Sequence, residues 1–266
     1  MKKNVGLILI LIGTATILTL GCSNPAGSSA GGTGTPGTPP PSSFTMDLTD
    51  ETGSVPEGAA LEDYGFDGVA YVFINAEGDI ESTGPGGWEA LPTFTTPDFL
   101  IDRNDENGVE VTWAARYPET SGVRWKENNK TWIRLLDEQG NTILETLYKP
   151  NGSSSEAHSW DLSLSDQSGT LETATTGLVT GDSSSTPAND AEWIDFRLVI
   201  EPTVAAGGSG SISLYFNGEE TPRISRLWEA ATQFHGLHFE YKTGTADSTF
   251  AVQVRGLSID STTAPE

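Results

Sequence analysis

The stretch that decides the fold is Trp193-Ile-Asp-Phe-Arg-Leu-Val-Ile-Glu201, followed after a glycine-rich break by Gly210-Ser-Ile-Ser-Leu-Tyr-Phe-Asn217-Gly218. Apolar and polar residues alternate in both runs, which is typical of a β-strand with one buried face. The second run ends at Asn217-Gly218, a pair that tolerates positive φ, so we expect a tight turn there. These residues predict two strands and a turn.

The same alternation recurs along the chain between clusters of Gly, Asn and Asp. The segment Asp137–Asn141 has the composition of a hairpin turn. Only Arg226–Phe234 has apolar residues at helical spacing, which predicts one short helix. Strands are predicted near Val69–Ile74, Gly108–Tyr117, Thr131–Asp137, Thr142–Tyr148, His158–Leu164, Trp193–Glu201, Ser211–Phe216, Gly236–Lys242 and Thr249–Ile259.

Three features together resemble the concanavalin A-like lectin/glucanase family, including laminin-G-like modules. They are the strand led by Trp193, the Tyr215-x-Asn217-Gly218 end of the next strand, and a closing strand at Ala251–Asp260. The resemblance covers roughly Phe44–Asp260 and implies an all-β, two-sheet antiparallel jelly-roll sandwich. A fibronectin-like or carbohydrate-binding sandwich of different topology is the alternative. This fold hosts many activities, so it does not by itself determine function.

The first 21 residues have the layout of a secretory signal. Two lysines precede an apolar run from Val5 to Leu20, which is shorter than the ~20 residues that a membrane-spanning helix needs. The run ends at Gly21-Cys22, which holds the only cysteine of the chain. The box Leu18–Cys22 resembles the cleavage box of bacterial lipoproteins, although Thr19 and Leu20 differ from the residues usual there.

This second resemblance implies that residues 1–21 are removed and that Cys22 carries lipid. Ser23 is compatible with sorting to the outer membrane, so we expect a lipid-anchored protein of the bacterial cell envelope, at the outer membrane or cell surface. Residues 22–43 are rich in Gly, Ser and Pro and predict a flexible linker. Residues 44–266 are predicted to form one sandwich domain. An ordinary secretory signal with an incidental cysteine is the alternative.

The composition is strongly acidic, with 37 Asp and Glu against 14 Lys and Arg and a net charge of −23. Such a surface repels nucleic acid and anionic lipid headgroups, so neither is expected as a direct partner. With Cys22 lipidated, no thiol remains for a disulfide, and stability must come from packing. The expected partners are the membrane, through the anchor, and a glycan or cell-envelope polysaccharide.

The enzymatic candidate is Glu77-Gly-Asp79-Ile-Glu81. Retaining jelly-roll glucanases project three carboxylates from alternate positions of one strand, so by resemblance Glu77, Asp79 and Glu81 would be nucleophile, helper and acid/base. Gly78 departs from the motif, which has a branched apolar residue there. The alternative is a hairpin turn over Asn75–Gly78, which would place the three carboxylates in water.

Sugar binding needs aromatic faces flanked by side chains that bond hydroxyl groups. The best local cluster is Arg116 and Tyr117, followed by a polar segment that contains Trp125 and Asn128. Trp88, which follows two glycines, is a second candidate. The alternative is that Trp125 caps one end of the sandwich.

Metal ligands do not converge in the sequence. His235 and His238 are three apart on a predicted strand and should point to opposite faces, while His158 lies far away. Asp102–Gly108 has the oxygen ligands of a calcium loop, but its glycine is misplaced for an EF-hand. No metal or cofactor is predicted, and calcium is left open because sandwiches of this family often carry one.

The sequence therefore favours a membrane-anchored surface lipoprotein that displays a non-catalytic carbohydrate-binding or adhesion sandwich. One alternative is a surface glycoside hydrolase that uses Glu77, Asp79 and Glu81. The other is a structural envelope lipoprotein without a small ligand.

Overall fold

The structure, a computed structural model, describes residues 40–48, 58–82, 91–103, 107–116, 130–151, 159–176, 193–230, 232–242 and 252–263. The predicted signal, Cys22 and most of the predicted linker lie outside the described residues. At the end of the predicted linker, the carbonyl oxygen of Pro41 accepts a hydrogen bond of 2.8 Å from the backbone N–H of Leu100. In the part of the chain that is described, no helix is long and apolar enough to cross a membrane.

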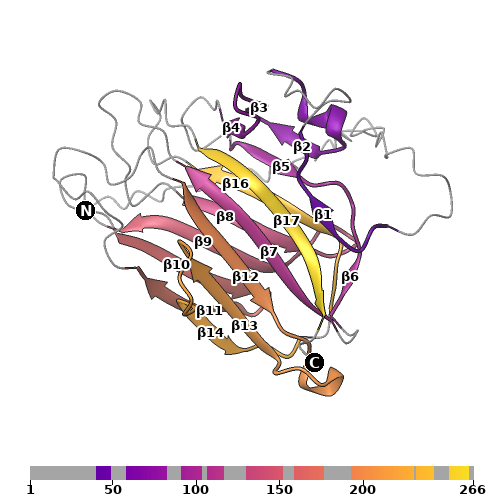
Figure 1. Cartoon of the computed structure of the whole chain (residues 1–266), viewed down its shortest axis with the longest axis vertical. Coiled ribbons are helices and arrows are strands. Elements are labelled where there is room, and N and C mark those ends of the chain that lie inside the picture. The colour runs from indigo at the N-terminus through magenta and orange to yellow at the C-terminus, as the bar shows by residue number, and fades with distance from the viewer. Residues whose placement is uncertain are drawn as a thin grey trace, which may run out of the picture. The chain divides into compact units, whose positions relative to one another are not determined.

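The described strands form two large antiparallel sheets (Figure 1), which we call sheet A and sheet B. The strands of sheet A are β1 (Phe44–Thr45), β3 (Val72–Ile74), β4 (Ile80–Ser82), β7 (Asn107–Arg116), β12 (Ile194–Ile200), β13 (Ser211–Phe216), β14 (Ile224–Leu227) and β17 (Gln253–Thr263). Their order in space is β14-β13-β12-β7-β17-β4-β3, and β1 also pairs with β17.

Sheet B has the order β11-β10-β9-β8-β16-β5-β2. Its strands are β2 (Asp67–Ala70), β5 (Thr93–Thr95), β8 (Lys130–Leu136), β9 (Thr142–Asn151), β10 (Ser159–Asp166), β11 (Gly169–Thr175) and β16 (Gly236–Lys242). A two-stranded pair, β6 (Ile101–Asp102) and β15 (Gln233–Phe234), and two short 3₁₀ helices, Leu61–Tyr64 and Val204–Ala206, complete the described elements. The prediction of an all-β, two-sheet antiparallel sandwich is confirmed.

Inward-facing side chains of both sheets form one apolar core. In β12 every second residue is buried, and the residues between them point outward. Phe196 of β12 stacks on Trp113 of β7 with ring centroids 5.0 Å apart, and Tyr148 of sheet B lies 4.5 Å from Phe196. Full burial of a large apolar side chain contributes ~1.5–3 kcal/mol, so this contact between the sheets is a main stabilising element.

The two turns predicted from composition are present. The Asp137 carboxylate, at the turn between β8 and β9, accepts backbone hydrogen bonds from Asn141 at 2.7 Å and Gln139 at 2.9 Å. The hydrogen bonds from Asn141, and after them the one from Gln139, hold the pKa of Asp137 below its ordinary value. Asn217 and Gly218 follow β13 with φ values of 51° and 72°.

The predicted strand Val69–Ile74 is wrong as a single element. The structure divides it into β2 in sheet B and β3 in sheet A, with Tyr71 between them at a φ of 56°. A left-handed residue turns the chain out of one sheet and into the other. Alternation of apolar residues cannot reveal this crossing, because both halves continue the same pattern.

The predicted helix Arg226–Phe234 is also wrong. Its first two residues end β14, Trp228 follows without regular structure, and its last two form β15. The backbone N–H of Trp228 donates to the carbonyl oxygen of Gly210, and its indole N–H donates to Asp166 of β10 at 3.1 Å. Trp228 therefore forms its hydrogen bonds with residues distant in the sequence and not along a helix, although the apolar residues of this segment have helical spacing. Leu227, which belongs to the expected apolar stripe, is 68% exposed.

Candidate functional site

A row of polar side chains crosses the outer face of sheet A at one end of its strands. Arg116 of β7 lies opposite Gln253 of β17, and Gln253 lies opposite Glu81 of β4. Trp193 directly precedes β12, whose first residue pairs with the neighbour of Arg116. We call Trp193, Arg116, Gln253 and Glu81 the Arg116 row.

Hydrogen bonds connect the Arg116 row. The Arg116 Nε donates to the Gln253 Oε1 at 2.6 Å, and the Gln253 Nε2 donates to the Glu81 Oε2 at 2.5 Å. Asn75 Nδ2 donates to the same Glu81 oxygen at 3.2 Å. Gln253 is only 5% exposed, so its amide is held between a cation and an anion with little access to water. The amide thereby fixes the position of both charged groups.

Two guanidinium groups lie over the ring of Trp193. The Cζ of Arg116 is 4.7 Å from a ring centroid of Trp193, and the Cζ of Arg255 is 4.0 Å away. Arg255 of β17 is paired with Ala114 of β7, whose small side chain leaves room above the sheet. Cation–π contacts of this kind orient the guanidinium plane and contribute ~0.5–1 kcal/mol at exposed sites.

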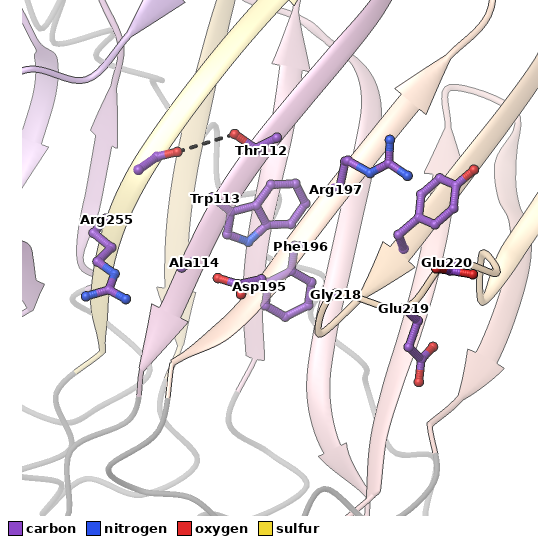
Figure 2. A pocket seen from close by; sticks show the side chains of 12 residues that line it. Thr112, Trp113, Ala114, Asp195, Phe196, Arg197, Gly218, Glu219, Glu220 and Arg255 are labelled. Carbon is purple, nitrogen blue, oxygen red and sulfur yellow. Dashed lines mark hydrogen bonds between the residues drawn. The ribbon is translucent and has the colours of Figure 1, made fainter.

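A hollow of about 550 Å³ lies on the outer face of sheet A beside the Arg116 row (Figure 2). Figure 2 shows Arg255 and Arg197 on opposite sides of Asp195. The Cζ of Arg197 lies 4.0 Å from the ring centroid of Tyr215, and its Nη1 is 3.3 Å from the Glu110 carboxylate. The lining residues are Thr112, Trp113, Ala114, Asp195, Phe196, Arg197, Tyr215, Gly218, Glu219, Glu220, Arg255 and Gly256.

The three carboxylates of the enzymatic candidate do not alternate along one strand. Glu77 is exposed in the turn between β3 and β4, whereas only Glu81 belongs to β4. The Asn75 Oδ1 accepts the backbone N–H groups of Glu77 at 3.0 Å and Asp79 at 2.9 Å, which closes this turn. The hairpin alternative is therefore correct in its geometry. Its expectation that all three carboxylates lie in water is wrong for Asp79, which is 6% exposed.

Asp79 lies close enough to the arginines of sheet A to interact with them. Burial raises the pKa of Asp79 above its ordinary value, while the nearby charges of Arg255 and Arg116 act in the opposite direction. The effect of burial is larger. Asp79 is therefore a carboxylate beneath the surface rather than one presented to a ligand.

Of the residues predicted to bind sugar, Arg116 belongs to the row just described. Tyr117, Trp125, Asn128 and Trp88 lie outside the described residues, so their role stays a prediction. The segment that carries Tyr117, Trp125 and Asn128 follows directly on Arg116 in the sequence.

The outer face of sheet B differs in how its cation is held. The Arg134 guanidinium of β8 is 2.7 Å from the carboxylate of Glu145 and 2.8 Å from that of Glu240. Burial alone would lower the pKa of Arg134, but the hydrogen bonds to Glu240 and Glu145 raise it. The Cζ of Arg134 also lies 5.4 Å from the ring centroid of Trp132. Both charges of each pair are thus matched within the protein.

His235 and His238 line the same hollow on sheet B, so the expectation that they point to opposite faces is wrong. The reason is that His235 precedes β16 and the alternation of a strand does not apply to it. The His238 Nδ1 is 2.9 Å from the Thr95 Oγ1, and burial, followed by the charge of Arg134, lowers the pKa of His238. Among the described residues no three His, Cys, Asp or Glu side chains gather as a metal site would require. Residues 104–106 of the calcium candidate lie outside the described ranges.

Sequence reasoning missed Trp193, Gln253 and Arg255 as site residues. Gln253 and Arg255 occupy alternate positions in β17, and Trp193 directly precedes β12. The sequence indicates for each of them only a place in or beside a strand. The available signal was the set of polar residues at alternate positions of each strand. These residues mark the outward positions, but they do not tell which strands are neighbours in the sheet.

No protein-family model matches the sequence, and no curated protein matches it. Several solved structures share the fold. The carbohydrate recognition domain of Emp47p has a TM-score of 0.54 at 9% identity, covering 82% of this chain and 94% of that domain. Winged bean acidic lectin in complex with methyl-α-D-galactose has a TM-score of 0.50 at 10% identity, covering 83% and 98%. The CBM2 module of the evolved Dit protein of Lactobacillus casei BL23 phage J-1 has a TM-score of 0.50 at 9% identity, covering 86% and 94%. The sandwich is therefore of the lectin-like, concanavalin A-like type.

Proposed function

We propose that this chain is a surface lipoprotein whose sandwich binds carbohydrate through the outer face of sheet A without cleaving it. The observation that carries the proposal is the hollow of about 550 Å³ beside the Arg116 row. It combines the ring of Tyr215 with the hydrogen-bonding groups of Asp195, Arg197 and Arg255. A few convergent polar groups around an aromatic side chain are typical of sugar sites.

The named ligands of the structural neighbours support the same class of function. Emp47p contributes a carbohydrate recognition domain, and the winged bean lectin is in complex with a methyl galactoside. At about 10% identity these likenesses concern the fold, so the proposal depends on the residues of the hollow. The hydrolase alternative gains no support from Glu77, Asp79 and Glu81, which do not share a strand.

The anchor belongs to the proposal as well. Removal of residues 1–21, lipid on Cys22 and a linker to residue 43 would display the domain of residues 44–266 at the outer membrane or cell surface. Two or three acyl chains on one cysteine give lasting attachment without a transmembrane helix. Intact-mass measurement of the purified chain should show acylated Cys22 at the amino terminus. A chain with a free thiol, or a Cys22→Ser variant equally retained in membranes, would contradict this part.

A glycan array probed with the full chain in detergent tests the binding function. We expect binding to at least one glycan class, and a roughly tenfold or greater loss for Tyr215→Ala, because the variant removes the aromatic wall of the hollow. Leu227→Ala is the matched control, since Leu227 belongs to the same sheet, is exposed and does not line the hollow. A flat array for the parent chain would favour the structural alternative. Release of new reducing ends from a bound glycan would favour the enzyme. Trp125→Ala on the same array tests the predicted sugar contact of the segment after Arg116.

A further inference from the structure

Arginines gather on one face of an acidic protein. The chain has 37 acidic and 14 basic residues, yet Arg116, Arg197 and Arg255 project from the neighbouring strands β7, β12 and β17 of sheet A. Arg197 lines the hollow together with Arg255, and Arg116 shares the Trp193 ring with Arg255.

Most of the acidic groups beside these arginines are already engaged. Glu110 pairs with Arg197 at 3.3 Å. Glu81 accepts hydrogen bonds from the amides of Gln253 and Asn75, and Asp79 is buried. Asp195 and Glu220 also line the hollow and are exposed, so the negative charge beside the row is matched only in part.

The guanidinium groups of Arg116 and Arg255 are less engaged. Arg116 donates its Nε to Gln253, and within the described residues neither of its Nη atoms has a hydrogen-bond or ion-pair partner. Within the same residues Arg255 lies over the ring of Trp193 and has no hydrogen bond or ion pair, although its charge acts on the buried Asp79. Its side chain is exposed. Stacking on an aromatic ring uses the face of a guanidinium and leaves the N–H groups at its edge available.

We propose that Arg116 and Arg255 bind the carboxylate of an acidic sugar, so that the ligand class of this lectin-like sandwich is a uronate-bearing polysaccharide. The inference rests on the proposed carbohydrate-binding function and narrows it. An arginine fork matches the two oxygens of a planar carboxylate, and such charge-assisted pairs are stronger than neutral hydrogen bonds. Asp195, which is exposed and lines the hollow together with Arg255, accepts hydrogen bonds from sugar hydroxyl groups.

Trp193 and Gln253 are positioning residues in this arrangement. The tryptophan ring holds two like-charged groups near each other, and the amide of Gln253 fixes Arg116 from the other side. Prior fixation of the guanidinium planes lowers the entropy cost of binding. The two arginines themselves are the groups that touch the ligand.

Binding of polygalacturonate to the full chain in detergent, compared with its fully methyl-esterified form, tests the charge requirement. The two polymers share a backbone and differ only in the carboxylate. We expect binding to the acid form and at least tenfold weaker binding to the ester. Equal binding to both polymers would overturn the inference.

Substitutions then test the residues. Arg255→Gln and Arg116→Gln should each weaken binding roughly tenfold to a hundredfold, which corresponds to one charge-assisted hydrogen bond of ~1.5–3 kcal/mol. Arg255→Lys keeps the charge but loses the planar fork, and it should also weaken binding several-fold. Lys149→Gln is the matched control, because it removes one positive charge from sheet B, where Lys149 pairs with Asp161. An equal effect of Lys149→Gln and Arg255→Gln would overturn the inference.

The outcomes distinguish the inferred acidic ligand from the proposed carbohydrate-binding function on which it rests. Array binding to neutral glycans alone leaves the proposed function standing and refutes the acidic ligand. Absence of binding to every glycan refutes both. Dextran sulfate bound as tightly as polygalacturonate would show that net charge, rather than carboxylate geometry, governs recognition, and it would overturn the carboxylate assignment.

Discussion

Arg134 on sheet B and Arg255 on sheet A are both arginines on the outer face of a strand and both lie over a tryptophan ring. They differ in their partners. Arg134 is shared between the carboxylates of Glu145 and Glu240, whereas Arg255 has no ion pair within the described part of the chain. The outer faces of the two sheets thus contain similar residues, and within the described residues the charge of Arg134 on sheet B is paired and that of Arg255 on sheet A is unpaired.

The two arginines therefore differ in what their charge contributes to, either the stability of the fold or the binding of a ligand. A half-buried cation between two carboxylates contributes to stability, because its removal leaves like charges facing each other. An exposed cation without a partner contributes little to folding and remains available for a ligand. Stability and ligand binding should therefore respond to different substitutions on the two faces.

The largest expected effect on stability is that of Arg134→Ala. This variant leaves Glu145 and Glu240 unpaired in a partly buried place, and we expect the free energy of unfolding to fall by about 2–3 kcal/mol. Arg255→Ala, the counterpart on sheet A, should change it by less than about 0.5 kcal/mol. Urea unfolding at pH 7 measures both. Similar losses for the two variants would show that the faces do not differ as described.

Gln253→Leu should have an intermediate effect. The substitution removes two hydrogen bonds to charged groups and leaves Arg116 and Glu81 without their shared partner, which should cost about 1–2 kcal/mol of unfolding free energy. Thr112→Val is the control, because it removes hydrogen bonds on the same face that involve no charged group, to the Ser258 hydroxyl at 2.9 Å and to the Gly256 carbonyl oxygen at 3.5 Å. A cost no larger than that of the control would mean that the Arg116 row does not depend on the amide.

The smallest effect concerns pH and sheet B. Burial lowers the pKa of His238 from its ordinary 6.5, so below pH 6.5 the unfolded chain takes up a proton before the folded chain does. The contribution of neutral His238 to the free energy of unfolding is present above pH 6.5 and is lost as the pH falls toward the lowered pKa. His238→Gln should make the decline in this pH range shallower. The check is a pair of urea-unfolding series across the range, and parallel curves for the two proteins would refute the assignment.

Much of the fold could be predicted because alternation is local. The segment that became β12 alternates without interruption, and its partner β13 ends at a turn that its own Asn-Gly pair specifies. The errors occurred where a distant contact decides the backbone. The β2–β3 crossing depends on Tyr71 leaving one sheet for the other, and Trp228 is drawn to Gly210 and Asp166 instead of continuing a helix.

The candidate site was harder to predict than the fold. Arg116 was identified from its neighbours in sequence, but Gln253 lies 137 positions away along the chain and meets it only through the pairing of β7 with β17. Outward positions on a strand are visible in the sequence, whereas the order of strands in a sheet is not.

What the sequence by itself determined is a β-sandwich of acidic composition, because periodicity is a property of adjacent residues and charge is a property of composition. Only the tertiary structure decided that Arg116 and Arg255 share the ring of Trp193 while Arg134 is matched by two glutamates. Strand order brings side chains from distant segments within a few ångströms, and at that range partners decide whether a charge stabilises the fold or stays available to a ligand.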